Sequence, residues 1–328
     1  MRTLSIAAIQ TAAVARDLDA TWAQFETQVR KVVALRPHVD LVVVPELLLA
    51  APAPMLVDDP DFDERAATTI PGPLTDRLGA LARELDVWLV PGSLVERDGD
   101  VLYNTAVAIS PAGEIVARYR KLFPWRPYEE LQPGREFTTF EIPGVCRVGL
   151  AICYDGSFPE VARQLAWLGA EVIIQPTLTT TRDREMEVVM ARANAFANQV
   201  FVVNLNGAAP SGVGRACSST PRARSCSTPP AARRCCSPCS ISTGCRRCAS
   251  TARSASIGRG RSSPTSARSS STRCSAVRSS CRRPGRLRST DSAIGRGAVG
   301  RSSNEAYRDP HLVGRVAKRI ETLTWSVE

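Results

Sequence analysis

The chain has 328 residues, of which 44% are hydrophobic and 23% are charged, so it is long enough for one large domain with a deep core. A formal net charge of +10 would ordinarily indicate an acidic partner such as nucleic acid. The charge is unevenly distributed, because residues 215–290 contain seventeen Arg and no Lys, Asp or Glu. The rest of the chain is therefore net acidic, and its composition argues against nucleic acid as a partner.

The sequence contains neither an apolar signal region near residue 1 nor a long apolar span. This predicts a soluble, cytoplasmic protein without a membrane partner. The cysteines follow the same division as the charge. Nine of the eleven lie between Cys217 and Cys281, and the other two are Cys146 and Cys153.

Strands and helices are predicted to alternate along the first two thirds of the chain. Apolar runs typical of buried strands lie at Leu4–Ile9, Leu41–Val44, Val87–Val90, Thr105–Ile109, Ile115–Arg118, Val148–Ile152, Val172–Gln175 and Val200–Asn204. Helical spacing of apolar residues lies at Ala20–Leu35, Leu74–Leu85, Phe158–Leu168 and Arg184–Asn198. Such alternation favours a layered α/β fold.

Two chemically reactive residues follow predicted strands directly. Glu46, in VVVPELLL, follows one apolar run, and Cys153, in GLAICYDGSFPE, follows another. Strand ends gather at one edge of an open α/β sheet, where sites commonly lie. A thiol needs a base to become a nucleophile, and its tetrahedral adduct needs a cation, which Lys121 in YRKLFPW could supply. The set indicates acyl transfer.

Each of these residues also has a purely structural interpretation. Cys153 could be a buried structural cysteine, Glu46 a surface or helix-terminal carboxylate, and Lys121 the end of a solvated basic strand. A cysteine and histidine mechanism is poorly supported, because the two histidines, His38 and His311, lie outside the motifs.

The spacing of the motifs resembles that of a known family. Lys121 lies 75 residues after Glu46, Glu129 lies 8 residues further, and Cys153 a further 24, with the flanks PE, YRK, PWRPYEE and ICYDGSFPE. This pattern resembles the nitrilase (carbon-nitrogen hydrolase) superfamily, and within it the aliphatic amidase and formamidase branch. The resemblance covers about residues 6–214 and implies a four-layer α-β-β-α sandwich.

The resemblance implies a role for each residue. Glu46 would act as general base and acid, Cys153 as the nucleophile, and Lys121 with the backbone N–H of Tyr154 would hold the oxyanion. Neither a metal nor an organic cofactor is expected. The implied reaction is hydrolysis of a small amide to a carboxylic acid and ammonia, with nitrile hydrolysis as the alternative.

The segment around Glu129 leaves more than one possibility open. Glu129 would pair with Lys121 or orient Glu46 and the substrate, while Glu130 is its rival on sequence grounds. Trp125 and Tyr128 either line the substrate pocket or pack only within their loop. The segment of residues 47–55, LLLAAPAPM, departs from the aromatic-containing segment of the nearest amidases, so the sequence leaves the identity of the amide open.

Residues 215–290 form an Arg, Ser and Cys-rich segment without an aromatic residue, which cannot build a core. One interpretation is a zinc site, because Cys236, Cys239, Cys245 and Cys248 form CxxC-x5-CxxC with an unusually short connection. A second is a basic nucleic-acid-binding tail, although aromatic residues for base stacking are missing. A third is translation of this stretch out of frame.

We favour the out-of-frame interpretation. Plausible codons for residues 217–223, read two bases later, give Leu-Val-Asp-Pro-Glu-Gly, and the same phase restores acidic and aromatic residues over 242–258. The domains are then a C-terminally incomplete carbon-nitrogen hydrolase domain at 1–214, the aberrant segment at 215–290, and a tail at 291–328. The tail has a possible short helix through Leu312, Val316 and Ile320.

An out-of-frame segment would have structural consequences. The last strands of the sandwich would be missing, leaving sheet surface exposed and weakening the homo-oligomer that the resemblance implies. An inactive, frameshifted relic is therefore an alternative to an active enzyme.

Overall fold

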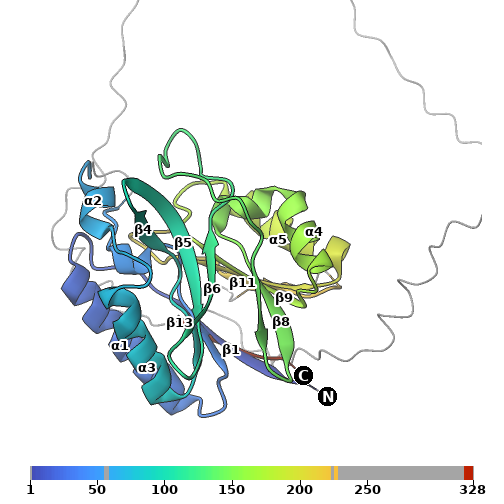
Figure 1. Cartoon of the computed structure of the whole chain (residues 1–328). Coiled ribbons are helices and arrows are strands. Elements are labelled where there is room, and N and C mark those ends of the chain that lie inside the picture. The colour runs from blue at the N-terminus through green and yellow to red at the C-terminus, as the bar shows by residue number, and fades with distance from the viewer. Residues whose placement is uncertain (1, 55–58, 223–224, 228–320, 328) are drawn as a thin grey trace, which may run out of the picture. The chain divides into compact units, whose positions relative to one another are not determined.

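The computed structural model describes residues 2–54, 59–222, 225–227 and 321–327, and Figure 1 shows their arrangement. Two β-sheets lie between two pairs of longer helices. The helices are α1 (Leu18–Leu35), α2 (Phe62–Ala66), α3 (Pro73–Leu85), α4 (Pro159–Trp167) and α5 (Arg184–Asn198), with 3-10 turns η1 (Leu48–Ala50) and η2 (Cys153–Ser157). None of the described helices is long and apolar enough to cross a membrane.

The first sheet has the strand order β13-β1-β2-β3-β5-β4, with β6 pairing with β5. Its strands are β1 (Leu4–Gln10), β2 (Leu41–Val43), β3 (Trp88–Val90), β4 (Leu94–Asp98), β5 (Val101–Ile109), β6 (Ile115–Arg120) and β13 (Glu321–Val327). The pairs β1·β2 and β2·β3 are parallel, and the others are antiparallel. Since β2 and β6 belong to one sheet, Glu46 and Lys121 both follow strands of this sheet.

The second sheet has the order β12-β11-β10-β9-β8-β7. Its strands are β7 (Thr139–Ile142), β8 (Cys146–Leu150), β9 (Val172–Thr177), β10 (Phe201–Asn206), β11 (Cys217–Ser219) and β12 (Ser225–Ser227). The central pairs β8·β9 and β9·β10 are parallel. Cys153 follows β8, so the candidate nucleophile belongs to the sheet opposite the one that bears the base.

Three hydrophobic clusters define the layers. Strand residues such as Ile6 and Val148 from the two sheets pack against each other in one cluster. Phe25 of α1 and Leu78 of α3 cover the outer face of the first sheet, and Leu165 of α4 packs with α5 on the outer face of the second. The predicted four-layer α-β-β-α sandwich is confirmed.

The local structure follows the sequence signals closely. In α1, Asp17 accepts a hydrogen bond from the Ala20 N–H at 2.8 Å as the N-cap, and the helix buries Trp22, Phe25 and Val29 on one face. The helix predicted over Arg184–Asn198 is found with those bounds. The sequence did not predict the described elements β4, β7 and α2, which are short or lack regular apolar alternation.

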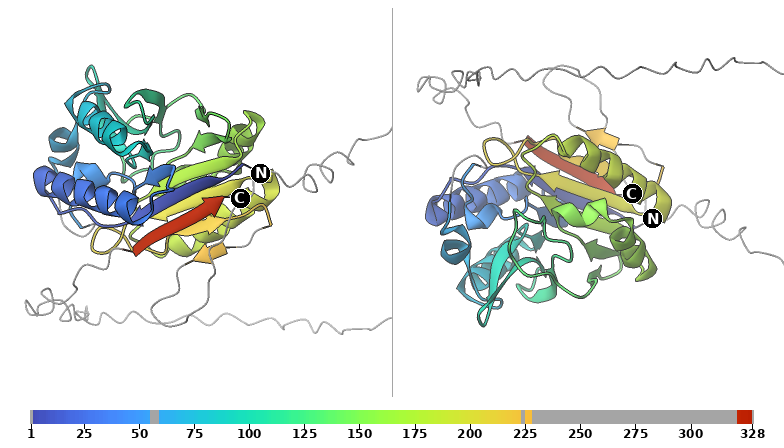
Figure 2. Two further views of the ribbon diagram at one scale, coloured as in Figure 1. Left: turned by 90° about the horizontal axis from the view of Figure 1, so that it is seen from below. Right: turned by 90° about the horizontal axis from the view of Figure 1, so that it is seen from above.

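The sheets continue beyond residue 214, where the sequence placed the end of the hydrolase domain. Strand β11 pairs with β10, β12 pairs with β11, and β13 pairs antiparallel with β1, which Figure 2 shows as the red strand beside the blue one. The expectation that strands would be missing after residue 214 is wrong at these positions. Strand pairing uses main-chain N–H and C=O groups, so Ser-rich and Cys-containing segments can form it without large apolar side chains. The cysteines of the proposed zinc site and the proposed helix at 312–320 lie outside the described residues.

Replacing Phe25 with Ala should lower the free energy of unfolding by about 3–5 kcal/mol, because the side chain is 1% exposed and its removal leaves a cavity under α1. Leu35→Ala in the same helix is the matched control, since Leu35 is 66% exposed and the expected change is below about 0.5 kcal/mol. Urea denaturation measures both, and equal losses would contradict the burial argument.

Candidate active site

Three of the predicted residues form a buried cluster of charges. The Lys121 ammonium lies 3.0 Å from Oε1 of Glu46 and 2.7 Å from Oε2 of Glu129. Lys121 is 2% exposed and Glu46 is 3% exposed. Glu129, and not its sequence rival Glu130, makes this contact. A buried ammonium therefore lies between two carboxylates, where each charge compensates the others.

Asn104 of β5 connects the two carboxylates, and sequence reasoning did not identify it. Its side-chain Nδ2 donates to Glu46 Oε1 at 2.9 Å and to Glu129 Oε1 at 2.8 Å. Its backbone carbonyl also accepts the Lys121 N–H at 2.8 Å. Asn104 directly precedes the strand predicted at 105–109. An Asn beside an apolar run is not in itself a sign of a catalytic residue. Asn104 fixes the distance between the two acids.

Glu46 is held by the β3–β4 connection. Gly92 has a φ of 77°, and a Cβ added to it would lie 1.9 Å from the Pro45 carbonyl oxygen, so only glycine fits this close approach. The next residue, Ser93, is buried, and its hydroxyl accepts a hydrogen bond from the Leu47 N–H at 3.2 Å. The segment bearing Glu46 is thus restrained on both sides of the carboxylate.

Cys153 begins the η2 turn with a φ of 45°, in the left-handed region that costs energy for a residue other than glycine. Gln175 of β9 stabilises this turn, because its side-chain Nε2 donates to the Cys153 carbonyl at 2.8 Å. Asn194 of α5 donates to the Gly156 carbonyl at 2.9 Å, a structural hydrogen bond. These contacts hold the thiol at the end of β8 in a conformation it would not adopt alone.

Asp155 anchors the turn to the opposite sheet. The buried carboxylate accepts hydrogen bonds from the Tyr119 hydroxyl at 2.7 Å, the Ile152 N–H at 2.8 Å and the Phe123 N–H at 2.9 Å. Burial raises the pKa of Asp155 to about 6, against the lowering effects of the Lys121 charge and these donors. The sequence indicated only a turn at this position. The partners that give Asp155 its role lie 32 to 36 residues away for Phe123 and Tyr119.

The surroundings of the four catalytic candidates shift their pKa values in different ways and so favour different protonation states. Burial and the Glu46 carboxylate raise the pKa of the Cys153 thiol well above its usual range. Burial also raises the pKa of Glu46. Burial acts in the same direction on Glu129, but the Lys121 charge and the hydrogen bonds from Lys121, Trp125 and Asn104 together outweigh it and lower the pKa of Glu129. Burial alone would lower the pKa of Lys121, but Glu46, Cys153 and Glu129 together raise it well above the usual value. The resting site therefore holds a neutral thiol, a charged ammonium and Glu46 as the carboxylate nearest to accepting a proton.

A cavity of about 270 Å³ opens beside Cys153. Trp125 and Tyr154 line it, and the backbone N–H of Leu178 donates toward the Cys153 sulfur. Tyr128 does not line this cavity. It is 73% exposed and packs on Trp125 with ring centroids 4.5 Å apart, which corresponds to the loop-packing alternative that the sequence left open. An aromatic residue on a surface loop can bury one face against a neighbour and remain largely in water.

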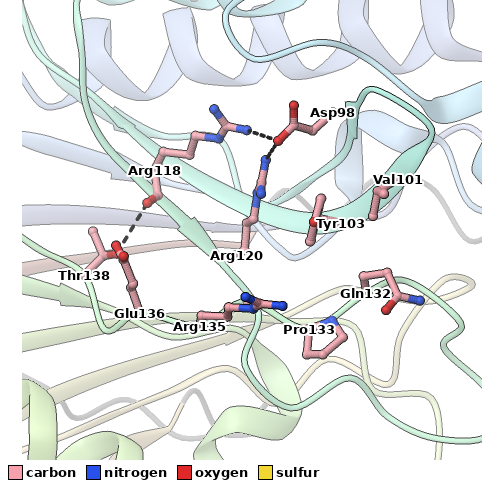
Figure 3. A pocket seen from close by; sticks show the side chains of 11 residues that line it. Asp98, Val101, Tyr103, Arg118, Arg120, Gln132, Pro133, Arg135, Glu136 and Thr138 are labelled. Carbon is pink, nitrogen blue, oxygen red and sulfur yellow. Dashed lines mark hydrogen bonds and ion pairs between the residues drawn. The ribbon is translucent and has the colours of Figure 1, made fainter.

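A larger cavity of about 820 Å³ lies on the outer face of the first sheet and contains none of the four residues. Figure 3 shows Arg118 and Arg120 pointing toward Asp98, and the two arginines also pair with the fully buried Glu96. The carboxylates thus compensate the arginine charges locally. The smaller cavity is the one with a nucleophile, and it is the candidate active site. Among the described residues, no group of three or more His, Cys, Asp or Glu side chains is arranged to hold a metal ion.

Comparisons with known proteins identify the family to which the chain belongs. A sequence model for carbon-nitrogen hydrolases matches residues 5–230. A formamidase of Bacillus cereus strain Q1 is 35% identical over 200 residues, which cover 60% of this chain and 59% of the relative. A formamidase of Bacillus thuringiensis strain Al Hakam is 34% identical over the same shares. The matched region thus spans less than two thirds of these relatives.

Solved structures show the same fold. Nit3 of Saccharomyces cerevisiae, a member of branch 10 of the nitrilase superfamily, has a TM-score of 0.62 and 25% identity, covering 68% of this chain and 84% of that one. An amidase from Nesterenkonia sp. has a TM-score of 0.59 and 23% identity over the same shares. The family match over residues 5–230, together with the fold, confirms the resemblance seen in the sequence. The chain belongs to the carbon-nitrogen hydrolase family.

Proposed function

We propose that this protein hydrolyses the carbon-nitrogen bond of a small amide, giving a carboxylic acid and ammonia. One observation carries the proposal: the Lys121 ammonium lies within 3.0 Å of both Glu46 and Glu129, next to a cavity that exposes the Cys153 thiol. The Bacillus relatives are formamidases, and the fold is shared with an amidase, which supports amide hydrolysis. A base, a cation and a thiol at one cavity are the parts that acyl transfer requires.

In the proposed acylation step, Glu46 accepts the proton of the Cys153 thiol while the sulfur attacks the amide carbonyl. The raised pKa of the thiol makes this base necessary, because little thiolate forms without it. The carbonyl oxygen becomes an oxyanion that the Lys121 ammonium and the Tyr154 N–H stabilise. Glu46 then gives the proton to the departing nitrogen, so ammonia leaves and a thioester to Cys153 remains.

In the deacylation step, Glu46 accepts a proton from a water molecule whose oxygen attacks the thioester carbonyl. The carbon-sulfur bond breaks, the acid is released, and the proton returns to the sulfur. Glu129 takes no proton in this scheme. Its lowered pKa keeps it ionised, so it holds Lys121 charged and, through Asn104, holds Glu46 in place.

The segment at 215–290 has no role in the proposed reaction. What we propose about it concerns its origin in the gene. We propose that it arises by translation out of frame, and the nucleotide sequence of the gene would test this directly.

Self-association, which the family resemblance implies, stays a prediction that analytical ultracentrifugation of the full chain would test.

Replacing Cys153 with Ala should lower amide turnover at least about 10³-fold, because the nucleophile is removed and no thioester can form. Ammonia release from formamide and acetamide measures the loss. Cys146→Ala is the matched control, since Cys146 is a buried cysteine of β8 outside the site, and it should retain turnover. Unchanged turnover in Cys153→Ala would exclude the thioester mechanism.

Replacing Asn104 with Ala should shift the acid limb of the kcat/KM profile to higher pH by about one unit. The change removes a donor that favours the ionised Glu46, so the pKa of Glu46 rises further and the base is lost at a higher pH as the solution is acidified.

Asn198→Ala is the control for this shift. Its side chain donates only to the Asn194 carbonyl within α5, away from the carboxylates. In the unmodified chain, the apparent pKa of the acid limb of the kcat/KM profile should itself lie above that of an ordinary glutamate, because burial raises the pKa of Glu46. Superimposable profiles for the two variants and the unmodified chain would show that Asn104 does not control this base.

A further inference from the structure

One wall of the active-site cavity, formed by α5 and the segment before it, carries two carboxylates that the proposed mechanism does not use. Asp183 and Glu187 line the cavity together with Leu178, Met186 and Met190. Among the described residues that line it, none is a lysine or an arginine. A substrate in this cavity would therefore meet apolar side chains and two carboxylates.

Glu187 is built into the wall of the cavity. Its side chain is 10% exposed, and the Thr179 hydroxyl lies 2.7 Å from each of its carboxylate oxygens. The buried Arg184 donates to its Oε2 at 2.9 Å from behind. Its charge is close enough to help raise the pKa of Cys153. Glu187 thus presents a fixed, partly compensated carboxylate near the nucleophile.

Asp183 provides the second carboxylate, at the rim of the cavity. It precedes the first residue of α5, is exposed, and accepts a hydrogen bond from the Thr181 hydroxyl at 2.8 Å. The ion pair to Arg184 supplies one positive charge to the two carboxylates of this wall, so the wall has an excess negative charge. A cation bound there would make charge-assisted hydrogen bonds in a partly desolvated place.

The position of the catalytic groups decides which part of an amide meets this wall. The nitrogen that departs must lie near Glu46, which is buried and does not line the cavity. The acyl substituent must therefore extend from Cys153 into the cavity. Leu178, Met186 and Met190 offer apolar contact to a methylene chain, and the carboxylates lie beside them.

We propose that this site prefers amides whose acyl chain ends in a positively charged group, an ω-ammonium amide, which Asp183 and Glu187 bind. The inference rests on the proposed amide hydrolysis and names its substrate class. The cavity volume of about 270 Å³ is small for a ligand site, which favours a short chain over a bulky one.

The test compares 4-aminobutanamide with pentanamide, in which a methyl group replaces the ammonium at equal length. At neutral pH and low ionic strength, kcat/KM for the ammonium amide should be higher by at least about fivefold. The ratio should fall as salt is added, because the interaction is electrostatic and partly exposed. β-Alaninamide and 5-aminopentanamide are one methylene shorter and one methylene longer than 4-aminobutanamide. Comparing kcat/KM for the three ammonium amides identifies the chain length that fits the cavity.

The variant Asp183→Asn should lower the ratio, since the asparagine keeps the shape and removes one of the two charges, while Glu187 stays in place. Asp19→Asn is the matched control, because Asp19 is an exposed acid in the first turn of α1, and it should keep the full ratio. Equal or better use of pentanamide by the unmodified chain, or an unchanged ratio in Asp183→Asn, would overturn the inference.

A binding measurement separates this inference from the proposed hydrolysis. If neither amide is hydrolysed, amide hydrolysis fails as the function, and protection of Cys153 against iodoacetamide then reports binding alone. The ammonium amide should protect at concentrations at least about fivefold lower than pentanamide. Equal protection by the two amides would overturn the charge preference independently of turnover.

Discussion

The buried contact of the Lys121 ammonium with the carboxylates of Glu46 and Glu129 is the interaction on which the site depends. Taking an ammonium out of water costs several kcal/mol, and only close, hydrogen-bonded partners offset this. Removing one partner would leave a buried charge without compensation. Each of the three side chains therefore depends on the other two to remain charged inside the protein. The proposed chemistry uses the same arrangement, because a cation that is already desolvated and fixed would stabilise an oxyanion without reorganising.

The two sheets bring this charge cluster to the thiol. Asn104 lies in β5 of the first sheet, where Glu46 and Lys121 follow β2 and β6. Cys153 follows β8 of the second sheet. The hydrogen bond from the Tyr119 hydroxyl of β6 to Asp155 joins the first sheet to the turn that bears Cys153. Catalytic geometry is therefore set by how the sheets pack, and the apolar cluster between them contributes to activity as well as to stability.

The proposed mechanism gives different tasks to different parts of the site. In it, the charge cluster on the first sheet controls the proton and the oxyanion, while the cavity wall formed by α5 and the segment after β9 would contact what the substrate carries beyond its carbonyl. Because the two parts belong to different elements, the acyl-binding wall can vary in charge without altering Glu46, Lys121 or Cys153.

The sequence by itself determined the order of most strands and helices, the four catalytic candidates and the family, because apolar periodicity and motif spacing are local properties of the chain. The bounds of α5 and the choice of Glu129 over Glu130 agree with it. Only the tertiary structure decided the roles of Asn104 and Asp155, the exposure of Tyr128, and the pairing of β13 with β1. These features depend on contacts between residues far apart in the chain, because a polar side chain takes its role, and a strand its place in the sheet, from a partner that local sequence does not reveal.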